Sequence, residues 1–239
     1  MTDSQNGRSS RDPQAQKSVA VEDYAKAIYA LDRRAEGAVG TGALAERLGV
    51  SPASVTAMLK RMAEMKLVSH EPYHGVTLTE SGERVALEVI RHHRLIESYL
   101  AEALGMPWDR VHEEAEVLEH YISEELEERI ALALDDPTRD PHGDPIPDRE
   151  LELSSETGVT LAGLEPGREG VFGRVSDSDP EMLRYLEQRN IKPGTDVRVI
   201  GRQPFGGPML VEFAGVEHAI GDELARRMLI DAAPGEAAP

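Results

Sequence analysis

The stretch LAERLGVSPASVTAMLKRM, residues 44–62, decides how the N-terminal third of this chain folds. Its first part predicts a short helix that ends at Gly49, a residue that readily adopts the left-handed conformation of a helix end. Ser51 then offers an N-cap, and Pro52 suits the first position of a second helix. Apolar residues recur at 3–4 spacing along that second helix. A helix, a tight turn and a capped helix form the helix-turn-helix pattern.

Strand-like runs at 67–69 and 76–79 predict a β-hairpin after the second helix. A helix-turn-helix followed by such a wing predicts a DNA-binding module over 18–79, preceded by a disordered polar tail, 1–17. Short hydroxyl and basic side chains on the first turns of the second helix are placed to reach phosphates or base edges. These candidate DNA contacts are Ser51, Ser54, Thr56, Lys60 and Arg61. A helical hairpin with no role in DNA binding is the alternative.

The net charge of −18 argues against nucleic-acid binding at first sight, because affinity for DNA comes largely from phosphate neutralisation. The acidic residues are unevenly distributed, however. Residues 1–75 carry ten Lys and Arg against nine Asp and Glu, whereas residues 76–135 carry five against fifteen. The nearly neutral N-terminal segment can therefore bind a DNA duplex. Bound divalent cations would neutralise part of the negative charge in the rest of the chain.

Composition excludes several other classes of protein. The chain has no cysteine, so it forms neither disulfides nor thiolate metal sites. It has no apolar run long enough to span a membrane and no apolar segment of a secretory signal at its start. We therefore expect a cytoplasmic protein that does not enter the membrane.

The rest of the chain divides into a helical part and a β-rich part. Apolar periodicity predicts helices over 80–104 and 111–134, and the Pro- and Asp-rich segment 135–148 reads as an extended connector. Short strand-like runs then predict a small SH3-like β-barrel over 156–232. The runs are 169–175, 195–203 and 208–213, with a helix near 180–188.

Two groups of side chains have the chemistry of metal ligands. Glu116, Glu119 and His120 stand at i, i+3 and i+4, so they converge on one point of a helix face. The second group is His93 and Glu97, at i and i+4 on the preceding helix, with His112 closing over them if the helices pack antiparallel. Carboxylates and imidazoles at these spacings are typical of metal-binding helical bundles. Either group taken alone is more simply explained as a solvated helix face.

In the order of its parts the chain resembles the diphtheria toxin repressor family of metal-dependent regulators, and more closely its manganese transport regulator branch. The resemblance covers about 20–230. It rests on EDYAKAIYAL (22–31), LAERLGVSPASVTAMLKRM (44–62), GVTLTESG (75–82), RHHRLIESYL (91–100), VHEEAEVLEH (111–120) and DPHGDPIP (140–147).

The resemblance implies a mainly α protein with a small β domain. The predicted parts are a tail (1–17), a winged helix-turn-helix DNA-binding domain (18–79), a helical dimerisation and metal-binding domain (80–142), a linker (143–155), an SH3-like, FeoA-like β-barrel (156–232) and a second tail (233–239).

The same resemblance implies two metal sites. The primary site would comprise Asp23, Glu116, Glu119 and His120, although nothing local singles out Asp23. The ancillary site would comprise His93, Glu97 and His112, completed by oxygen ligands from the barrel. The barrel candidates are Asp177, Asp179 and Glu181, with Asp177 and Asp179 preferred.

Ligand chemistry favours manganese. Iron-sensing relatives carry a Met and a Cys in the primary site, whereas Asp23 and Glu116 stand at those positions here. Hard oxygen ligands suit Mn²⁺, and Fe²⁺, Co²⁺ or Zn²⁺ are expected to bind in vitro because affinity follows the Irving–Williams order. Lys26 stands where some two-domain manganese regulators carry a second acid, so a binuclear pair of that kind is not expected.

The predicted function is a manganese-dependent repressor that binds a pseudo-palindromic double-stranded DNA operator as a homodimer and controls metal-homeostasis genes. It is not expected to be an enzyme. An iron-dependent regulator of the same architecture is the first alternative. A metalloenzyme is the second, although no nucleophile or activating base accompanies the ligands. A winged-helix regulator with an organic effector is the third, and it would leave the carboxylate and histidine groups without a role.

Overall fold

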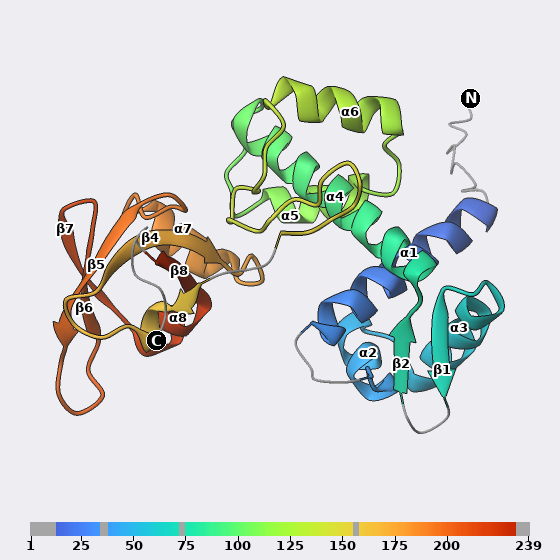
Figure 1. Ribbon diagram of the computed structural model, residues 1–239, viewed down its shortest axis with the longest axis horizontal. Helices are drawn as coiled ribbons and strands as arrows, with labels where there is room; N and C mark the ends of the chain where they lie inside the picture. The colour runs from blue at the N-terminus through green and yellow to red at the C-terminus, as the bar shows by residue number, and fades with distance from the viewer. Residues whose placement is uncertain (1–12, 34–37, 72–74, 155–157, 233–239) are drawn as a thin grey trace, which may run out of the picture. The chain divides into compact units, whose positions relative to one another are not determined.

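The computed structural model describes residues 13–33, 38–71, 75–154 and 158–232 of the chain (Figure 1). The chain forms two compact units, Met1–Ile90 and Arg91–Pro239. Each unit has hydrophobic core clusters of its own. Within the described ranges, no helix combines the length and the hydropathy needed to cross a membrane.

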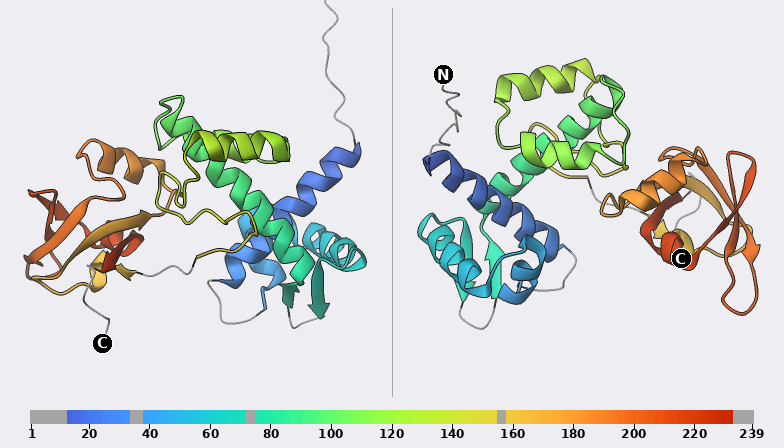
Figure 2. Two further views of the ribbon diagram at one scale, coloured as in Figure 1. Left: turned by 45° about the horizontal axis from the view of Figure 1, so that its top comes forward. Right: turned by 180° about the vertical axis from the view of Figure 1, so that it is seen from behind.

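The first unit contains the predicted winged helix-turn-helix. Its elements are α1 (Pro13–Asp32), α2 (Thr41–Leu48), α3 (Pro52–Glu64), β1 (Val68–Glu71) and β2 (Gly75–Leu78). The two strands pair antiparallel, with Val68 opposite Leu78, and Figure 2 shows this hairpin beside α3 from two further sides. Leu44, Val55 and Leu59 are fully buried in a core that the three helices share with the hairpin. The apolar stripe of 44–62 therefore packs as its spacing predicts.

The turn between α2 and α3 forms for the local reasons expected. Gly49 ends α2 with φ of 65°, a conformation that costs a residue with a Cβ roughly 1–2 kcal/mol. Ser51 caps α3, because its Oγ accepts a hydrogen bond from the backbone N–H of Ser54 at 3.1 Å. Pro52 occupies the first turn, where it loses no helical hydrogen bond. These signals set the direction in which α3 leaves the turn.

The first helix begins earlier than its apolar pattern predicts. Helix α1 starts at Pro13, so residues 13–17 of the predicted disordered tail are helical. Proline at the first position and the following Gln, Ala and Lys residues all tolerate or favour a helix. Periodicity cannot detect such an extension, because it contains no large apolar side chain that could repeat at helical spacing. Residues 1–12 and the second predicted tail, 233–239, lie outside the described residues.

The second unit begins within α4 (Glu80–Glu102), which continues from the first unit, and also contains α5 (Val111–Leu118) and α6 (Glu124–Ala133). The prediction of a single helix over 111–134 is wrong. The Ser123 side chain accepts a hydrogen bond from the N–H of Leu126 at 3.3 Å and starts α6 as a separate helix. Its first turn is acidic, which favours a helix N-terminus. Those acids are Glu124, Glu125 and Glu127.

The Pro-rich segment 135–148 is a packed part of the second unit rather than an extended connector. Two arginines of α4, Arg91 and Arg94, donate hydrogen bonds to its backbone carbonyls. The Asp140 carboxylate accepts two backbone N–H groups of the turn that follows it. These bonds satisfy polar backbone groups inside the protein and allow the segment to be buried. Its buried residues are Asp140, His142, Gly143, Asp144, Pro145, Ile146 and Pro147.

The rest of the second unit is a small SH3-like barrel over 159–232, drawn in yellow to red in Figure 1. Its elements are β3 (Val159–Thr160), η1 (Leu161–Gly163), β4 (Glu169–Val175), α7 (Pro180–Glu187), β5 (Asp196–Arg202), β6 (Met209–Phe213), β7 (Val216–Ile220), α8 (Asp222–Arg227) and β8 (Met228–Ala232). The strand order is β3-β8-β4-β5-β6-β7, and the pairs are antiparallel. The three predicted strands and the predicted helix are confirmed, and Phe172, Leu183 and Phe213 lie at the centre of the core.

Candidate metal centre

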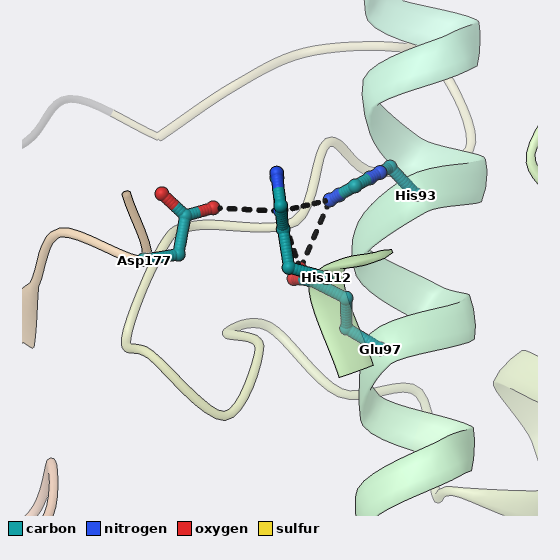
Figure 3. A group of neighbouring side chains, drawn as sticks. All are labelled: His93, Glu97, His112 and Asp177. Atoms are coloured by element: carbon teal, nitrogen blue, oxygen red, sulfur yellow. Dashed lines mark hydrogen bonds and ion pairs between the residues drawn. The ribbon is translucent and has the colours of Figure 1, made fainter. Parts of the chain in front are cut away.

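Four side chains of the second unit each bring one nitrogen or oxygen atom to a common point (Figure 3). His93 and Glu97 lie on α4, His112 lies at the start of α5, and Asp177 lies between β4 and α7. His112 Nδ1 is 3.1 Å from His93 Nε2, 3.2 Å from Glu97 Oε1 and 3.1 Å from Asp177 Oδ2. His93 Nε2 and Glu97 Oε1 are 2.9 Å apart. The structure therefore brings together the predicted ancillary group and one of its barrel candidates.

The chemistry of this group is that of a divalent-cation site. Neighbouring ligands of an ion with bonds of about 2.1 Å lie roughly 3 Å apart, as these four atoms do. Glu97 is 1% exposed, and a buried carboxylate requires compensation by cations or hydrogen bonds. All four ligand atoms are nitrogen or oxygen, a set that suits Mn²⁺, Fe²⁺ and Zn²⁺ rather than soft copper.

Protons supply the positive charge in the metal-free group. Hydrogen bonding to Asp177, supported by Glu97, raises the pKa of His112 to about 10. Burial would raise the pKa of Asp177, but the hydrogen bond from His112 outweighs it and lowers that pKa to about 2. Burial also opposes ionisation of Glu97, yet hydrogen bonds from surrounding histidines hold its pKa well below the usual range. A cation entering this group must therefore displace protons from imidazole nitrogens.

Two further candidate ligands, Asp140 and His142, were missed by the sequence analysis. His142 Nε2 donates a hydrogen bond to the Trp108 carbonyl at 2.8 Å, so its Nδ1 faces Glu97 Oε2 at 3.6 Å as a lone-pair donor when the ring is neutral. His142 Nδ1 and Glu97 Oε2 are buried without a hydrogen-bond partner. With Asp140 they form a fully buried group on the far side of the Glu97 carboxylate. The histidine in DPHGDP was the available signal, but a segment read as a connector was not expected to fold back onto α4.

The predicted primary group is brought together in part. Glu119 Oε1 lies 3.4 Å from His120 Nε2, and Glu119 Oε2 lies 2.5 Å from His93 Nδ1. Glu116 Oε1 lies 3.9 Å from the same His93 nitrogen. Although Glu119 follows the last residue of α5, its φ of −54° and ψ of −29° continue the helical path, so the expected spacing holds. His93 thus faces the primary group with Nδ1 and the ancillary group with Nε2.

The other predicted metal ligands have different surroundings. Asp23 is half-buried on α1 of the first unit, and its pairing with the second unit stays a prediction. Asp179 caps α7, where its Oδ1 accepts hydrogen bonds from two backbone N–H groups at 3.0 and 3.3 Å. The structure does not place Asp179 or Glu181 in a ligand group with Asp177. An aspartate just before a proline-started helix is a typical N-cap, and this signal was available in DSDPEML.

The candidate DNA contacts share one helix surface. Val55, Leu59 and Met62 turn the other side of α3 into the core. Thr56 donates its hydroxyl hydrogen bond to the carbonyl of Pro52, four residues earlier. Of the predicted contacts, Ser51, Ser54, Thr56 and Lys60 are exposed and Arg61 is half-buried. These side chains are accessible to a ligand, and their contact with DNA stays a prediction.

Three family profiles match the chain, one for each structural part. Residues 18–76 match the iron dependent repressor N-terminal DNA binding domain. Residues 79–148 match the iron dependent repressor metal binding and dimerisation domain, and residues 159–232 match the FeoA domain. With the winged helix and the buried ligand groups, these matches define a three-domain, metal-dependent DNA-binding regulator.

Full-length relatives identify the family. The diphtheria toxin repressor of Corynebacterium efficiens is 32% identical over 223 residues, which cover 89% of this chain and 95% of the relative. The iron-dependent repressor IdeR of Mycobacterium leprae is 39% identical over 181 residues, 75% of this chain and 69% of its own. A solved structure described as a manganese-dependent transcriptional repressor in complex with manganese has a TM-score of 0.80 and 38% identity, and the match covers 89% of this chain and all of that one. The chain belongs to the diphtheria toxin repressor family. These relatives are transcriptional repressors, which argues against the alternative of a metalloenzyme.

Proposed function

We propose that this protein is a manganese-dependent transcriptional repressor that binds a pseudo-palindromic operator as a homodimer. The observation that carries the proposal is the set of ligand groups built only from carboxylate oxygens and imidazole nitrogens, in a chain without cysteine. Such hard ligands favour Mn²⁺ over softer choices. The similar manganese-dependent repressor of known structure supports the same metal. As a DNA-binding regulator it would act in the cytoplasm.

The proposed switch couples the first helix to the second unit. Asp23 of α1 would join Glu116, Glu119 and His120 as the primary ligand set. A bound cation supplies the positive charge that lets these carboxylates lie close together. Asp23 would then hold α1, and with it the recognition helix α3, in a fixed orientation. In a dimer this orientation sets the spacing of two α3 helices against successive major grooves, ~34–36 Å apart.

The homodimer is supported by the surface of the helical region. Several large apolar side chains of α5, α6 and the turn between them are exposed in the single chain. Large exposed apolar side chains are candidates for an interaction surface, and the profile matched in this region is named for dimerisation. They are Val117, Leu118, Tyr121, Leu126 and Leu132. A two-fold interface formed by this surface would present both DNA-binding units to one operator.

The test is DNA binding measured against metal. A duplex selected in vitro with the full-length protein and Mn²⁺ would be labelled and titrated by fluorescence anisotropy with Mn²⁺ or with chelator. We expect tight binding only with Mn²⁺, and a Glu116→Ala variant that remains a folded dimer but no longer responds to metal. Glu114→Ala is the matched control, because Glu114 is an exposed glutamate of the same helix outside the ligand groups. Equal affinity with Mn²⁺ and with chelator contradicts the proposal.

Iron is the second candidate activator. The identity with the iron-dependent repressor of Mycobacterium leprae supports it, and the nitrogen and oxygen ligands also accept Fe²⁺. Anaerobic titrations of DNA binding with Mn²⁺ and Fe²⁺, side by side, separate the two. Activation by Fe²⁺ at a lower free concentration than Mn²⁺ would replace the manganese assignment and leave the ligand groups unchanged.

A further inference from the structure

We propose that Trp108 and Asp109, in the loop between α4 and α5, are positioning residues that hold the barrel so that Asp177 reaches the metal centre. The inference rests on the proposed metal-binding function of His93, Glu97, His112 and Asp177. It concerns how one ligand is delivered: three of the four lie on the α4–α5 pair, whereas Asp177 comes from the barrel domain.

Trp108 belongs to the helical region by sequence but to the barrel by packing. Its side chain is 4% exposed and is part of the same core cluster as Leu161, Phe172 and Leu183 of the barrel. Lys192 Nζ lies 5.9 Å from the centre of the indole ring, within cation–π range. Withdrawing this indole would leave a large void in the barrel core, which strongly destabilises a protein when the residue removed is a buried aromatic. The barrel is therefore anchored to the loop that leads into the His112 helix.

The same tryptophan contacts the ligand groups directly. Its ring stacks on the His142 imidazole with centroids 5.7 Å apart and planes inclined by 19°. Its carbonyl accepts the hydrogen bond from His142 Nε2 at 2.8 Å. A backbone carbonyl bound to one ring nitrogen sets the orientation of the other, which is the usual way that a metal-binding histidine is held. Trp108 thus connects the barrel core to the buried side of Glu97.

Asp109 provides the second connection, at the end of the barrel that carries Asp177. Its Oδ2 accepts a hydrogen bond from Arg184 on α7 at 2.9 Å, and the Asp109 side chain is 6% exposed. Helix α7 begins at Pro180, three residues after Asp177, and is capped by Asp179. An ion pair that holds α7 against the α4–α5 loop therefore also fixes the backbone from which Asp177 extends. The Arg184 side chain is 49% exposed, but loss of the pair would deprive the buried Asp109 carboxylate of this cationic partner, which is costly for a buried charge.

Through these two connections, the α4–α5 loop keeps Asp177 of the barrel close to the other three ligands. Asp177 Oδ2 must lie within bonding reach of the point shared with His112 Nδ1, and the two atoms are 3.1 Å apart in the structure. If the barrel were free to move on its linker, Asp177 would meet the other ligands at an effective concentration set by the chain between them. Contacts through Trp108 and Asp109 instead hold the barrel in one position, so that Asp177 stays next to the other ligands.

The experiment is a mutant cycle on the full-length protein, with Mn²⁺ binding followed by the EPR signal of the free ion. We expect Asp109→Arg and Asp177→Ala each to weaken Mn²⁺ binding to the ancillary group by ~10-fold or more, the scale of losses from supporting residues around a metal. In the Asp177→Ala background, Asp109→Arg should have no further effect, because it acts only through Asp177. The charge-exchanged variant Asp109→Arg with Arg184→Asp should recover most of the affinity.

Arg198→Asp is the matched control, since it reverses a barrel arginine paired with Glu212 on the neighbouring strand and should leave Mn²⁺ affinity unchanged. Asp109→Asn replaces Asp109→Arg if the latter does not fold, as judged by circular dichroism. Additive losses in the double variant, or wild-type affinity in Asp109→Arg, overturn the positioning role. Wild-type affinity in Asp177→Ala instead overturns the proposed metal role of Asp177, so the two failures are distinguishable.

Discussion

Replacing Gly143 by alanine should damage the metal centre without removing any ligand. Gly143 lies in the buried turn between His142 and Asp144, and its φ is +90°. A Cβ at this position would lie 1.9 Å from the carbonyl oxygen of Gly173 and 2.9 Å from Arg174 Cα, both backbone atoms of β4. Nothing in this contact is the end of a flexible side chain, so either the turn or the strand must move.

The expected cost has two parts. The positive φ costs an alanine roughly 1–2 kcal/mol. Forcing a methyl group into an occupied space adds about 1–3 kcal/mol. The destabilisation should therefore be ~2–5 kcal/mol in the second unit. Because the displaced turn carries His142, Mn²⁺ affinity should fall together with stability.

Gly194→Ala separates the two parts. Gly194 also has a φ of +90°, but a Cβ there would have no heavy atom within 4 Å. This control should show only the backbone cost and keep its Mn²⁺ affinity. Chemical denaturation gives the stability of each variant, and the EPR titration gives Mn²⁺ binding. If Gly143→Ala and Gly194→Ala lose the same stability and bind Mn²⁺ equally, the close packing of the turn against β4 does not support the metal centre.

Four further outcomes are expected. Mn²⁺ binding at neutral pH should release protons, because the raised pKa values of His112 (about 10) and His142 (about 9, where burial is outweighed by interaction with the nearby Glu97 carboxylate) keep both rings charged; calorimetry in buffers of different ionisation enthalpy counts the protons released. The stability that His112 gives the metal-free protein is fully present below its ordinary pKa, ~6.5, and is lost as the pH rises toward about 10, which denaturation at several pH values will show; a flat profile contradicts it. Lys60→Ala should weaken operator binding and reduce its salt dependence by ~1 contact, whereas Glu64→Ala on the same helix should not; an unchanged salt slope removes Lys60 from the interface. Leu132→Asp, which places a charge on the exposed apolar surface of α6, should produce monomers in sedimentation, and a persistent dimer would place the interface elsewhere.

Local sequence signals were sufficient to predict the structure of the DNA-binding unit. The Gly49 turn, the Ser51 cap and the apolar stripe of α3 act within a few residues of one another, and each keeps its expected role. The pairing of His93 with Glu97 was readable for the same reason, because i and i+4 positions meet on any helix.

Features that depend on contacts between distant parts of the chain could not be predicted from the sequence. The break after Glu119 is a different case, because the cap at Ser123 is a local signal that the continuous apolar pattern of 111–134 outweighed in the prediction. His142 becomes a candidate ligand only because Arg91 and Arg94 of α4 bind the backbone of the Pro-rich segment, and no local sequence pattern encodes that contact. Asp179 shows the opposite case, since a local capping signal was present but was outweighed by the expectation of a metal ligand.

Trp108 is the only tryptophan in the chain, and it lies where the barrel, the α4–α5 loop and the ring of His142 meet. Its ultraviolet emission therefore comes from a single, known place, with no other indole to contribute background. Any event that separates the barrel from the loop, or that changes the charge on the stacked imidazole, alters the surroundings of this one fluorophore. The protein thus carries an intrinsic optical reporter, which allows the arrival of a cation to be followed in real time without a label.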